Sequence, residues 1–536
     1  MPDVARVRRE VAEEGAGDVV VPLPALLKGR LVYPEVPAAA ELNELLSPAE
    51  GDVFRPASRP IVTDRCYVVA LPAEQPSTQR RRRCVVVFPR INPSSLLEPD
   101  YDGLVGELFN LPFEEVLDFM ARLARVIADR QSWSRAAAEF MRGIPGFDPS
   151  DVELAVTTLP HLLRPGSIRE ALERELGDAG ASYLDGWVPV ETTVEPGASA
   201  RTAELVRPRE DPGPTERHPR LRAMPTRQLH ITAGNSVMTP LISLVRAFAT
   251  KGAATVKTTV ATAPAMTVVA HALREAGAEH PLVRHTSIVY WPGGDERVED
   301  VLFARGSFDR LVAWGSERTL ASITERARTS KLTLFRPRVG MTLVGRETFE
   351  ADLDDVAASA VTDVMIDNQH ACSSSLVHYV EGEEEQVVAY CRAVQHALAS
   401  WERAAPVMVS RADVASLRSL RRGELAQARW FENFSGGVVS SAVAYTSQEV
   451  DLAGHPMCRL VIVRRVSDLE DALRYVNDAV AAVGVHPEAR RLELRDRLAA
   501  RGVSNVCPLG HCDRAYAGIP HDGVRPLHDL VNWISE

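Results

Sequence analysis

The sequence predicts an α/β fold with largely parallel sheets, and three observations lead to this prediction. From about residue 228 onward, short apolar runs alternate with amphipathic helical segments, which is the pattern of βαβ units. The chain has 536 residues, a length that corresponds to roughly two to four structural units. Hydrophobic residues make up 45% and charged residues 25% of the chain, so a disordered chain or a small disulfide scaffold is excluded.

Charge and cysteine content restrict the partners and the compartment. Lys and Arg number 61 against 72 Asp and Glu, a net charge of −11, so nucleic acid is not an expected partner. No run approaches the roughly 20 continuous apolar residues that a membrane span needs, and the amino end lacks the apolar segment of a secretory signal. The seven scattered cysteines favour free thiols. We therefore expect a cytoplasmic protein.

The first half of the chain contains three regions with different residue patterns. The apolar runs 66–71 and 84–88 predict strands or irregular structure in a region rich in Pro and Val. A helix is predicted over 112–130, and helical character continues toward Gly177, because apolar side chains recur at helical spacing from Val116 to Ile127. A connector is predicted over 196–227, where six prolines stand among many charges.

After the connector, strands and helices alternate. Strands are predicted over 228–232, 254–257, 282–290, 310–314 and 460–464, and helices over 241–249, 265–276, 298–303, 316–328, 352–366, 383–401 and 469–483. Gly252 suits the left-handed position that follows a helix.

Two residues are candidates for chemistry at turns. Cys372 follows a predicted helix and precedes an apolar run, where free backbone N–H groups can stabilise a thiolate; a buried structural thiol is the alternative. Asn235 follows the strand 228–232, at the sheet edge where α/β proteins bind ligands. It either caps the next helix or points its amide into a site.

Further candidates lie at neighbouring strand ends. Lys257 closes the strand 254–257 and can donate to a ribose or a phosphate, or can be a solvated strand end. Gly315 and Ser316 form a strand-to-helix junction that suits an anion. The glycine-rich fingerprints of dinucleotide sites and P-loops are absent. Cys507 and Cys512 form only half of a zinc motif, so we expect no metal site.

Four motifs, taken in their order along the chain, resemble those of the aldehyde dehydrogenase superfamily. Within it they resemble the acyl-CoA reductase family typified by the fatty-acid reductase of bacterial luminescence. They are residues 230–235, 256–257, 312–316 and 369–373, with Asp522 and Gly523 completing the set. The similarity covers roughly residues 110–536. It implies an N-terminal extension of unknown role (1–105), a Rossmann-like nicotinamide-binding domain (106–340, with the connector), a catalytic cysteine domain (341–490), and a C-terminal segment (491–536) that returns to the core or an oligomer interface.

The resemblance implies a role for each candidate. Cys372 is the acyl-accepting cysteine, and Asn235 is the oxyanion-hole amide. The nicotinamide cofactor is held by the following residues: Lys257, Thr259, Trp314, Gly315, Ser316 and, by a looser correspondence, Asp451. Thr259 and its neighbours replace a glutamate that often grips the ribose of NAD, so NADPH is favoured, with NADH as the alternative.

One departure from the superfamily bears on the reaction. Oxidising members carry a glutamate general base, but the corresponding stretch 331–338 has no carboxylate, nor does any residue between Glu325 and Glu347. We therefore expect no carboxylate beside the thiol, so that an acyl-cysteine waits for hydride instead of meeting activated water. The implied function is NADPH-dependent reduction of an acyl thioester, on CoA or a carrier protein, to an aldehyde.

Three other functions remain open. The chain can be an NAD-dependent CoA-acylating aldehyde dehydrogenase that works in the oxidative direction, a cysteine acyltransferase without nicotinamide, or a silent scaffold. The family's precedent implies an acyl-activating ligase as partner and a homo-oligomer.

Overall fold

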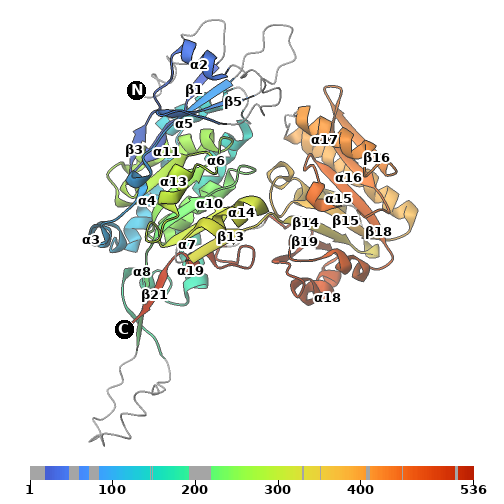
Figure 1. Cartoon of the computed structure of the whole chain (residues 1–536). Coiled ribbons are helices and arrows are strands. Elements are labelled where there is room, and N and C mark those ends of the chain that lie inside the picture. Colours follow the sequence, from blue (N-terminus) through green and yellow to red (C-terminus); the bar gives the residue numbers. More distant parts are fainter. Residues whose placement is uncertain are drawn as a thin grey trace, which may run out of the picture.

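The computed structural model describes residues 19–46, 60–71, 84–144, 147, 149–191, 219–328, 331–350, 352–405, 411–449, 451–513 and 517–536. They form two α/β lobes that lie side by side (Figure 1). The first lobe comprises the described residues up to 335 together with 526–535, and the second lobe comprises 339–508. The predicted α/β class is confirmed. Among the described residues, every helix is too short or too polar to cross a lipid bilayer.

The sheet of the first lobe has seven strands in the order β13-β12-β9-β10-β11-β2-β3. Five are parallel: β9 (Arg227–Ile231), β10 (Ala253–Thr258), β11 (Thr286–Tyr290), β12 (Arg310–Trp314) and β13 (Lys331–Phe335). The chain order reverses between β9 and β12. In open α/β sheets, ligands bind at the carboxyl ends of the strands at such a reversal.

Helices cover both faces of this sheet. Between the strands run α10 (Met238–Ala249), α11 (Ala263–Gly277), α12 (Pro281–Arg284), α13 (Glu296–Leu302) and α14 (Glu317–Arg326). A second layer contains α4 (Phe113–Ala128), α5 (Trp133–Arg142) and α6 (Pro149–Leu162), which pack against α11. The predicted helix over 112–130 is confirmed as α4, and its apolar stripe from Val116 to Ile127 is buried. The lobe also contains η1 (Pro93–Leu96), α3 (Tyr101–Leu104), η2 (Val105–Phe109), α7 (Pro165–Leu176) and α8 (Ser182–Asp185).

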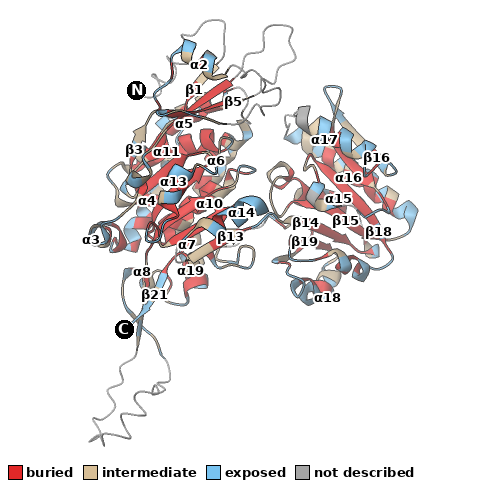
Figure 2. Ribbon diagram, viewed as in Figure 1, coloured by how far each residue is buried: buried red, intermediate tan, exposed pale blue. Residues whose placement is uncertain are grey.

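The described N-terminal residues are part of the first lobe. Strands β2 (Ala25–Leu27) and β3 (Arg30–Val32) add to its sheet. A second sheet, next to α2 (Ala39–Leu46), has the order β1-β6-β5-β4, from β1 (Val19–Pro22), β4 (Ile61–Val62), β5 (Cys66–Leu71) and β6 (Cys84–Pro89). Leu23, Leu26 and Phe88 belong to the same hydrophobic core as α4 and α11, and the buried colour continues from one into the other (Figure 2). Removing residues 1–105 would therefore expose this core to water.

The second lobe repeats the doubly wound pattern with the order β16-β17-β18-β15-β14-β19-β20. Its strands are β14 (Val339–Val344), β15 (Ser375–Glu381), β16 (Arg429–Ser435), β17 (Val438–Tyr445), β18 (Leu460–Val466), β19 (Val480–His486) and β20 (Asn505–Pro508). All are parallel except β16. Its helices are η3 (Arg346–Glu350), α15 (Leu353–Val364), η4 (Ile366–Gln369), α16 (Glu384–Ala404), α17 (Arg411–Arg422), η5 (Leu452–Gly454), η6 (Leu469–Tyr475) and α18 (Glu488–Ala499).

The C-terminal residues return to the first lobe. After β20, helix α19 (Pro526–Asp529) packs into the first core, and β21 (Asn532–Ser535) pairs with β8 (Arg220–Met224) beside β7 (Val188–Pro189). Residues 196–218 of the predicted connector lie outside the described residues. The rest of it is not irregular, since β8 and the start of β9 fall within 219–227.

Three sequence predictions were wrong in detail. The predicted helix 469–483 is the short η6 followed by β19, because residues 480–483 are buried on both faces of a central parallel strand, a pattern that periodicity does not separate from a helix. The predicted strand 282–290 begins as α12, which His280 caps by accepting a hydrogen bond from the Leu282 amide. Gly252 is not left-handed; Lys251 is, with φ 53°. A Cβ on Gly252 would lie 2.2 Å from the Gln228 side chain, so close packing requires the glycine.

Candidate active site

The carboxyl edge of the first sheet gathers most of the predicted cofactor residues. Asn235 follows β9, Lys257 and Thr259 lie at the end of β10, and Gly315 and Ser316 follow β12. Since β9 lies between β10 and β12, these turns meet at the point where the chain order reverses. The topology therefore brings together residues that are up to 81 positions apart in the chain, between Asn235 and Ser316.

Lys257 is buried at this edge, with 8% of its surface exposed. Its Nζ lies 3.4 Å from the Thr258 carbonyl oxygen, 5.5 Å from the ring centre of Trp291 and 6.0 Å from that of Tyr290. Burial lowers the pKa of Lys257 to about 8, and the nearby Glu299 carboxylate opposes this shift. The protein thus gives this ammonium group only one long hydrogen bond among the described residues, so the group can donate hydrogen bonds to a ligand.

The turns beside Lys257 are closely packed. A Cβ on Gly234 would lie 3.0 Å from the Thr259 hydroxyl oxygen, and a Cβ on Gly315 would lie 3.2 Å from a methyl carbon of Thr319. Ser316 begins α14, where its hydroxyl accepts a hydrogen bond from the Thr319 amide at 3.3 Å. A larger residue would crowd Thr259 or Thr319 at these turns, and the N-terminus of α14 favours an anion.

Trp314 belongs to an aromatic group that reaches toward the second lobe. Its ring stacks on Phe335 with centroids 3.9 Å apart, and His521 contacts both rings edge-on at 5.1 Å. Trp314 therefore shapes the floor of the site through packing, and its indole nitrogen has no hydrogen-bond partner among the described residues.

Cys372 lies in the loop between η4 and β15, at the amino edge of the second sheet. Three consecutive residues before it have left-handed backbones: Asp367 (φ 46°), Asn368 (φ 53°) and Gln369 (φ 68°). Such backbones are unfavourable for residues with a Cβ. The fully buried Gln369 holds them in place, since it donates to the Leu460 carbonyl at 2.7 Å and accepts from the Leu460 amide at 3.0 Å.

Asn235 connects the first sheet to this cysteine loop. Its Nδ2 donates to the carbonyl oxygen of His370, two residues before Cys372, at 2.8 Å. An amide nitrogen carries two hydrogens, so one remains for another acceptor. The structure thus brings the predicted nucleophile and the predicted oxyanion amide to the same place.

The Cys372 thiol is neutral in this environment. Burial and the charge of Asp522 raise its pKa to about 12, against the opposing effects of Arg338 and of the backbone N–H groups of Cys372 and Ser373. At pH 7 the thiol is therefore almost entirely protonated. Attack by this sulfur needs a group that accepts its proton.

The expectation that no carboxylate lies beside the thiol was wrong. Donor atoms of Cys372, His521 and Asp522 all lie within 4.8 Å of one another. The stretch 331–338, where oxidising relatives carry the glutamate, indeed lacks a carboxylate. Asp522 supplies one instead, about 150 residues after the cysteine, from the segment between Pro508 and Pro526 that returns the chain to the first lobe (the C-terminal crossing). Asp522 pairs with Arg338 at 3.3 Å, and burial raises the pKa of Asp522 although Arg338 opposes this.

Sequence reasoning did not assign His521 or Arg338 to the site. The only local signal was the Asp522-Gly523 dipeptide, which is typical of a tight turn. Asp451 lies on the exposed connection between β17 and β18 in the second lobe, away from the turns that carry Lys257 and Gly315. Its role as a ribose contact stays a prediction.

Cys507 and Cys512 pack against the loop that carries Cys372. Their sulfur atoms are 3.0 Å apart, both are free thiols, and they pack with Ile366 and Ala371. Asp363 accepts hydrogen bonds from the Gly510 and Cys512 amides. The pair therefore supports the loop that carries Cys372.

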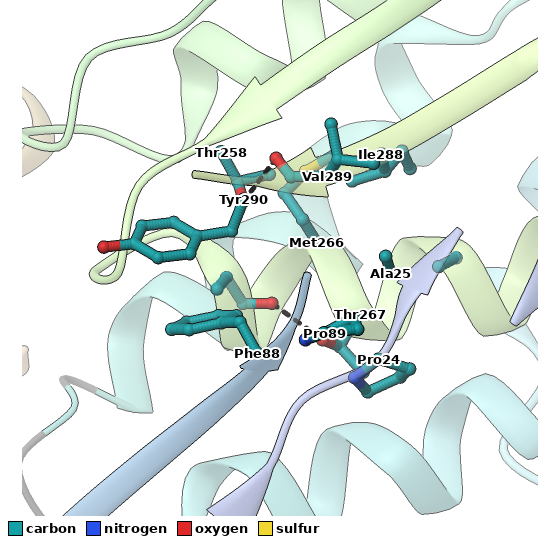
Figure 3. Close-up of a pocket in the computed structure, with 12 residues that line it drawn as sticks. Pro24, Ala25, Phe88, Pro89, Thr258, Met266, Thr267, Ile288, Val289 and Tyr290 are labelled. Carbon is teal, nitrogen blue, oxygen red and sulfur yellow. Dashed lines mark hydrogen bonds between the residues drawn. The ribbon is translucent and has the colours of Figure 1, made fainter. Parts of the chain in front are cut away.

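A small cavity lies on the other side of β10, where N-terminal residues meet α11 (Figure 3). Its volume is about 10 Å³, which is room for about one water. The rings of Phe88 and Tyr290 stack over it with centroids 4.1 Å apart. A cavity of this size does not hold a nucleotide, and it marks where Pro24 and Phe88 close over the first lobe.

Comparisons with known sequences find one matching family and several curated relatives. The sequence profile of the acyl-CoA reductase (LuxC) family matches residues 213–533. The chain is 26% identical over 321 residues to long-chain acyl-protein thioester reductase 2 of Photobacterium leiognathi, covering 59% of this chain and 65% of that protein. The corresponding reductase of Photorhabdus laumondii is 23% identical over 421 residues, covering 76% and 77%. The match to the first relative thus spans slightly under two thirds of its length.

Solved structures with a similar fold include several aldehyde dehydrogenases. The aldehyde dehydrogenase KauB of Pseudomonas aeruginosa has a TM-score of 0.66 at 13% identity and covers 99% of both chains. The indole-3-acetaldehyde dehydrogenase AldA of P. syringae, solved with NAD+, has a TM-score of 0.64 at 14% identity and covers 100% of this chain and 98% of its own. This chain therefore has the aldehyde dehydrogenase-like fold that the sequence predicted.

Proposed function

The chain belongs to the acyl-CoA reductase (LuxC) family, and from that membership we propose that it reduces an acyl thioester to an aldehyde through an acyl-cysteine at Cys372. The observation that carries the proposal is the hydrogen bond from Asn235 to the His370 carbonyl. This hydrogen bond joins the carboxyl edge of the first sheet to the loop that carries Cys372. The curated relatives are named as thioester reductases.

The residues at the carboxyl edge fit a nicotinamide dinucleotide. Lys257 has an ammonium group with only a long contact to the protein, and Gly315 precedes the N-terminus of α14, which favours an anion. Lys257 would hold the ribose, and the Gly315-Ser316 turn would hold the pyrophosphate. When bound, the reduced cofactor supplies a hydride. We propose NADPH as that cofactor, since Thr259 stands where a ribose-binding glutamate would exclude a 2′-phosphate.

The protein's own residues account for acyl transfer. As the Cys372 sulfur bonds to the acyl carbon, its proton leaves and the carbonyl oxygen becomes negative. The second N–H of Asn235 and the Cys372 backbone N–H can donate to that oxygen, and losing one such donor typically costs about 100- to 1,000-fold in rate. The carrier thiolate leaves, takes up a proton, and an acyl-cysteine remains. After hydride addition, the carbon–sulfur bond breaks, the aldehyde departs, and the Cys372 sulfur takes up a proton from solvent to become a thiol again.

The test is covalent labelling of the thiol. Wild-type protein incubated with acyl-CoA and no cofactor is expected to gain one acyl group on Cys372, detected by intact-mass and peptide mass spectrometry. Cys372→Ala is expected to gain none and to form no aldehyde, whereas Cys458→Ala, at another buried thiol, keeps both. An adduct on a different cysteine would refute the assignment. Asn235→Ala is expected to slow labelling about 100-fold or more.

Asp522 favours a second candidate function. A carboxylate near the thiol can activate water, so the same site would oxidise an aldehyde to an acid or to an acyl-CoA with NAD. Product analysis separates the two directions: aldehyde from acyl-CoA and NADPH supports reduction, and acid or acyl-CoA from aldehyde and NAD supports oxidation. The identity of the donor, CoA or a carrier protein, is read from the same assay.

We also propose that the protein acts as a homo-oligomer beside an acyl-activating ligase. The exposed strand β21, with Ile534 at its surface, supports self-association. Light scattering after size-exclusion chromatography tests the oligomer, and a monomer at micromolar concentration would contradict it.

A further inference from the structure

The C-terminal crossing places a histidine beside the reactive thiol. His521 and Val524 exchange backbone hydrogen bonds of 2.8 and 2.9 Å around Asp522 (φ 48°) and Gly523 (φ 78°). Two positive φ angles inside a four-residue turn define the tight hairpin type that favours Asp-Gly. This turn fixes the backbone of His521, and its side chain lies close to Cys372.

The imidazole ring is held on two sides. Trp314 and Phe335 contact it edge-on at 5.1 Å each, and a donor atom of the ring lies within 4.8 Å of both the Cys372 sulfur and Asp522. Its Nε2 is buried and has no hydrogen-bond partner among the described residues. A buried ring nitrogen without a partner is costly unless it serves a bound group or a reaction.

The charges around His521 keep the ring neutral. Burial lowers its pKa to about 3, and the guanidinium groups of Arg246 and Arg338 contribute in the same direction. A neutral imidazole can accept a proton, and the Asp522 carboxylate beside it would stabilise the imidazolium that forms.

We propose that His521 is the general base for acyl transfer to Cys372. The inference rests on the proposed function and adds a residue to it. As the Cys372 sulfur bonds to the acyl carbon, its proton passes to a ring nitrogen of His521; when the bond to the carrier sulfur breaks, the same proton passes to the leaving thiolate. No oxidant or reductant takes part, and His521 ends neutral.

The experiment measures single-turnover acylation of Cys372 by acyl-CoA, without cofactor, between pH 6 and 10. In the wild type, the rate is expected to be nearly constant between pH 6 and 9, because both the thiol and the imidazole are neutral there. In His521→Gln the rate is expected to be about 100- to 10,000-fold lower at pH 7. The acylation rate of His521→Gln should rise about tenfold for each unit of increase in pH, because only the small thiolate fraction of Cys372 reacts in this variant.

Two further variants keep the result interpretable. His528→Gln, at a half-buried position on α19, should keep the wild-type rate and profile. His521→Ala should recover part of its rate when imidazole is added to the solution, which a merely structural role would not produce. Circular dichroism and NADPH binding check that both His521 variants are folded.

The outcomes separate the two proposals. If the wild type forms no acyl adduct on Cys372, the proposed function fails. If the wild type is acylated and His521→Gln is acylated at the same rate, or at a rate reduced equally at every pH, the assignment of His521 is overturned. It is also overturned if Asp522→Asn, and not His521→Gln, acquires the tenfold slope, because Asp522 is then the proton acceptor.

Discussion

Replacing Gln369 with Glu tests how the cysteine loop is held. The buried Gln369 side chain donates to the carbonyl oxygens of Leu460 and Ser375, at 2.7 and 3.3 Å, and accepts from the Leu460 amide at 3.0 Å. A protonated Glu can keep the accepted bond and donate to one carbonyl. An ionised Glu would place a negative oxygen against two carbonyl oxygens.

The size of the effect follows from these contacts. A protonated Glu loses one neutral hydrogen bond, a cost of about 1 kcal/mol. The carbonyl oxygens and burial raise the folded-state pKa of the new carboxyl above its unfolded value of about 4.3. The folded protein then binds more protons than the unfolded chain, so stability falls as pH rises from the unfolded to the folded pKa. Each unit in that window costs about 1.4 kcal/mol, or about 4 kcal/mol from pH 5 to pH 8 if the folded pKa exceeds 8.

Urea unfolding at pH 5 and at pH 8 measures this difference against the wild type at the same two pH values. Hydrogen exchange of the peptide that contains Leu460 reports the local effect. The matched control is Gln395→Glu: the half-buried Gln395 donates to the Glu432 carbonyl at 2.9 Å, but a charged replacement can turn to solvent. A loss of stability in Gln369→Glu that is equal at both pH values, or no larger than in the control, would refute the reasoning.

Two further predictions concern the cofactor. NADPH affinity of the wild type should fall as pH rises through about 8, because Lys257 loses its positive charge there; Lys257→Met should bind roughly tenfold or more weakly, with no such pH dependence. Fluorescence titration of NADPH between pH 6.5 and 9.5 measures both, and a wild-type affinity that is flat with pH would contradict the role. Gly315→Ala should weaken NADPH binding severalfold, because its Cβ would meet a neighbouring side chain at 3.2 Å, whereas Gly166→Ala, which faces open space, should leave it unchanged. Equal affinities in the two glycine variants would exclude the turn as a cofactor contact.

The alternation of strands and helices made the first sheet predictable. Strands β9, β10 and β12 lie where the apolar runs indicated, because each is buried on both faces and ends at a polar turn. The segment 469–483 was misjudged for a related reason: a short apolar run is compatible with a helix or a buried strand until its neighbours are known. The two strands that flank β19 supply that information only in the folded chain.

The site was predictable only in part. Cys372 and Asn235 each stand at a recognisable turn, and the contact between Asn235 and His370 agrees with that prediction. The Asp522-Gly523 dipeptide indicated a turn, but no local signal placed His521 or Asp522 beside Cys372, because that proximity joins positions about 150 residues apart in the sequence. Local patterns record propensity and amphipathicity, and they do not record which distant turns meet.

The chain connects the two lobes twice. The chain passes from first to second lobe between Phe335 and Val339, and back again between Pro508 and Pro526. Two connections restrict the relative rotation of the lobes more than a single linker would. His521 lies on the second connection, so a change in the angle between the lobes would also change the distance between His521 and Cys372.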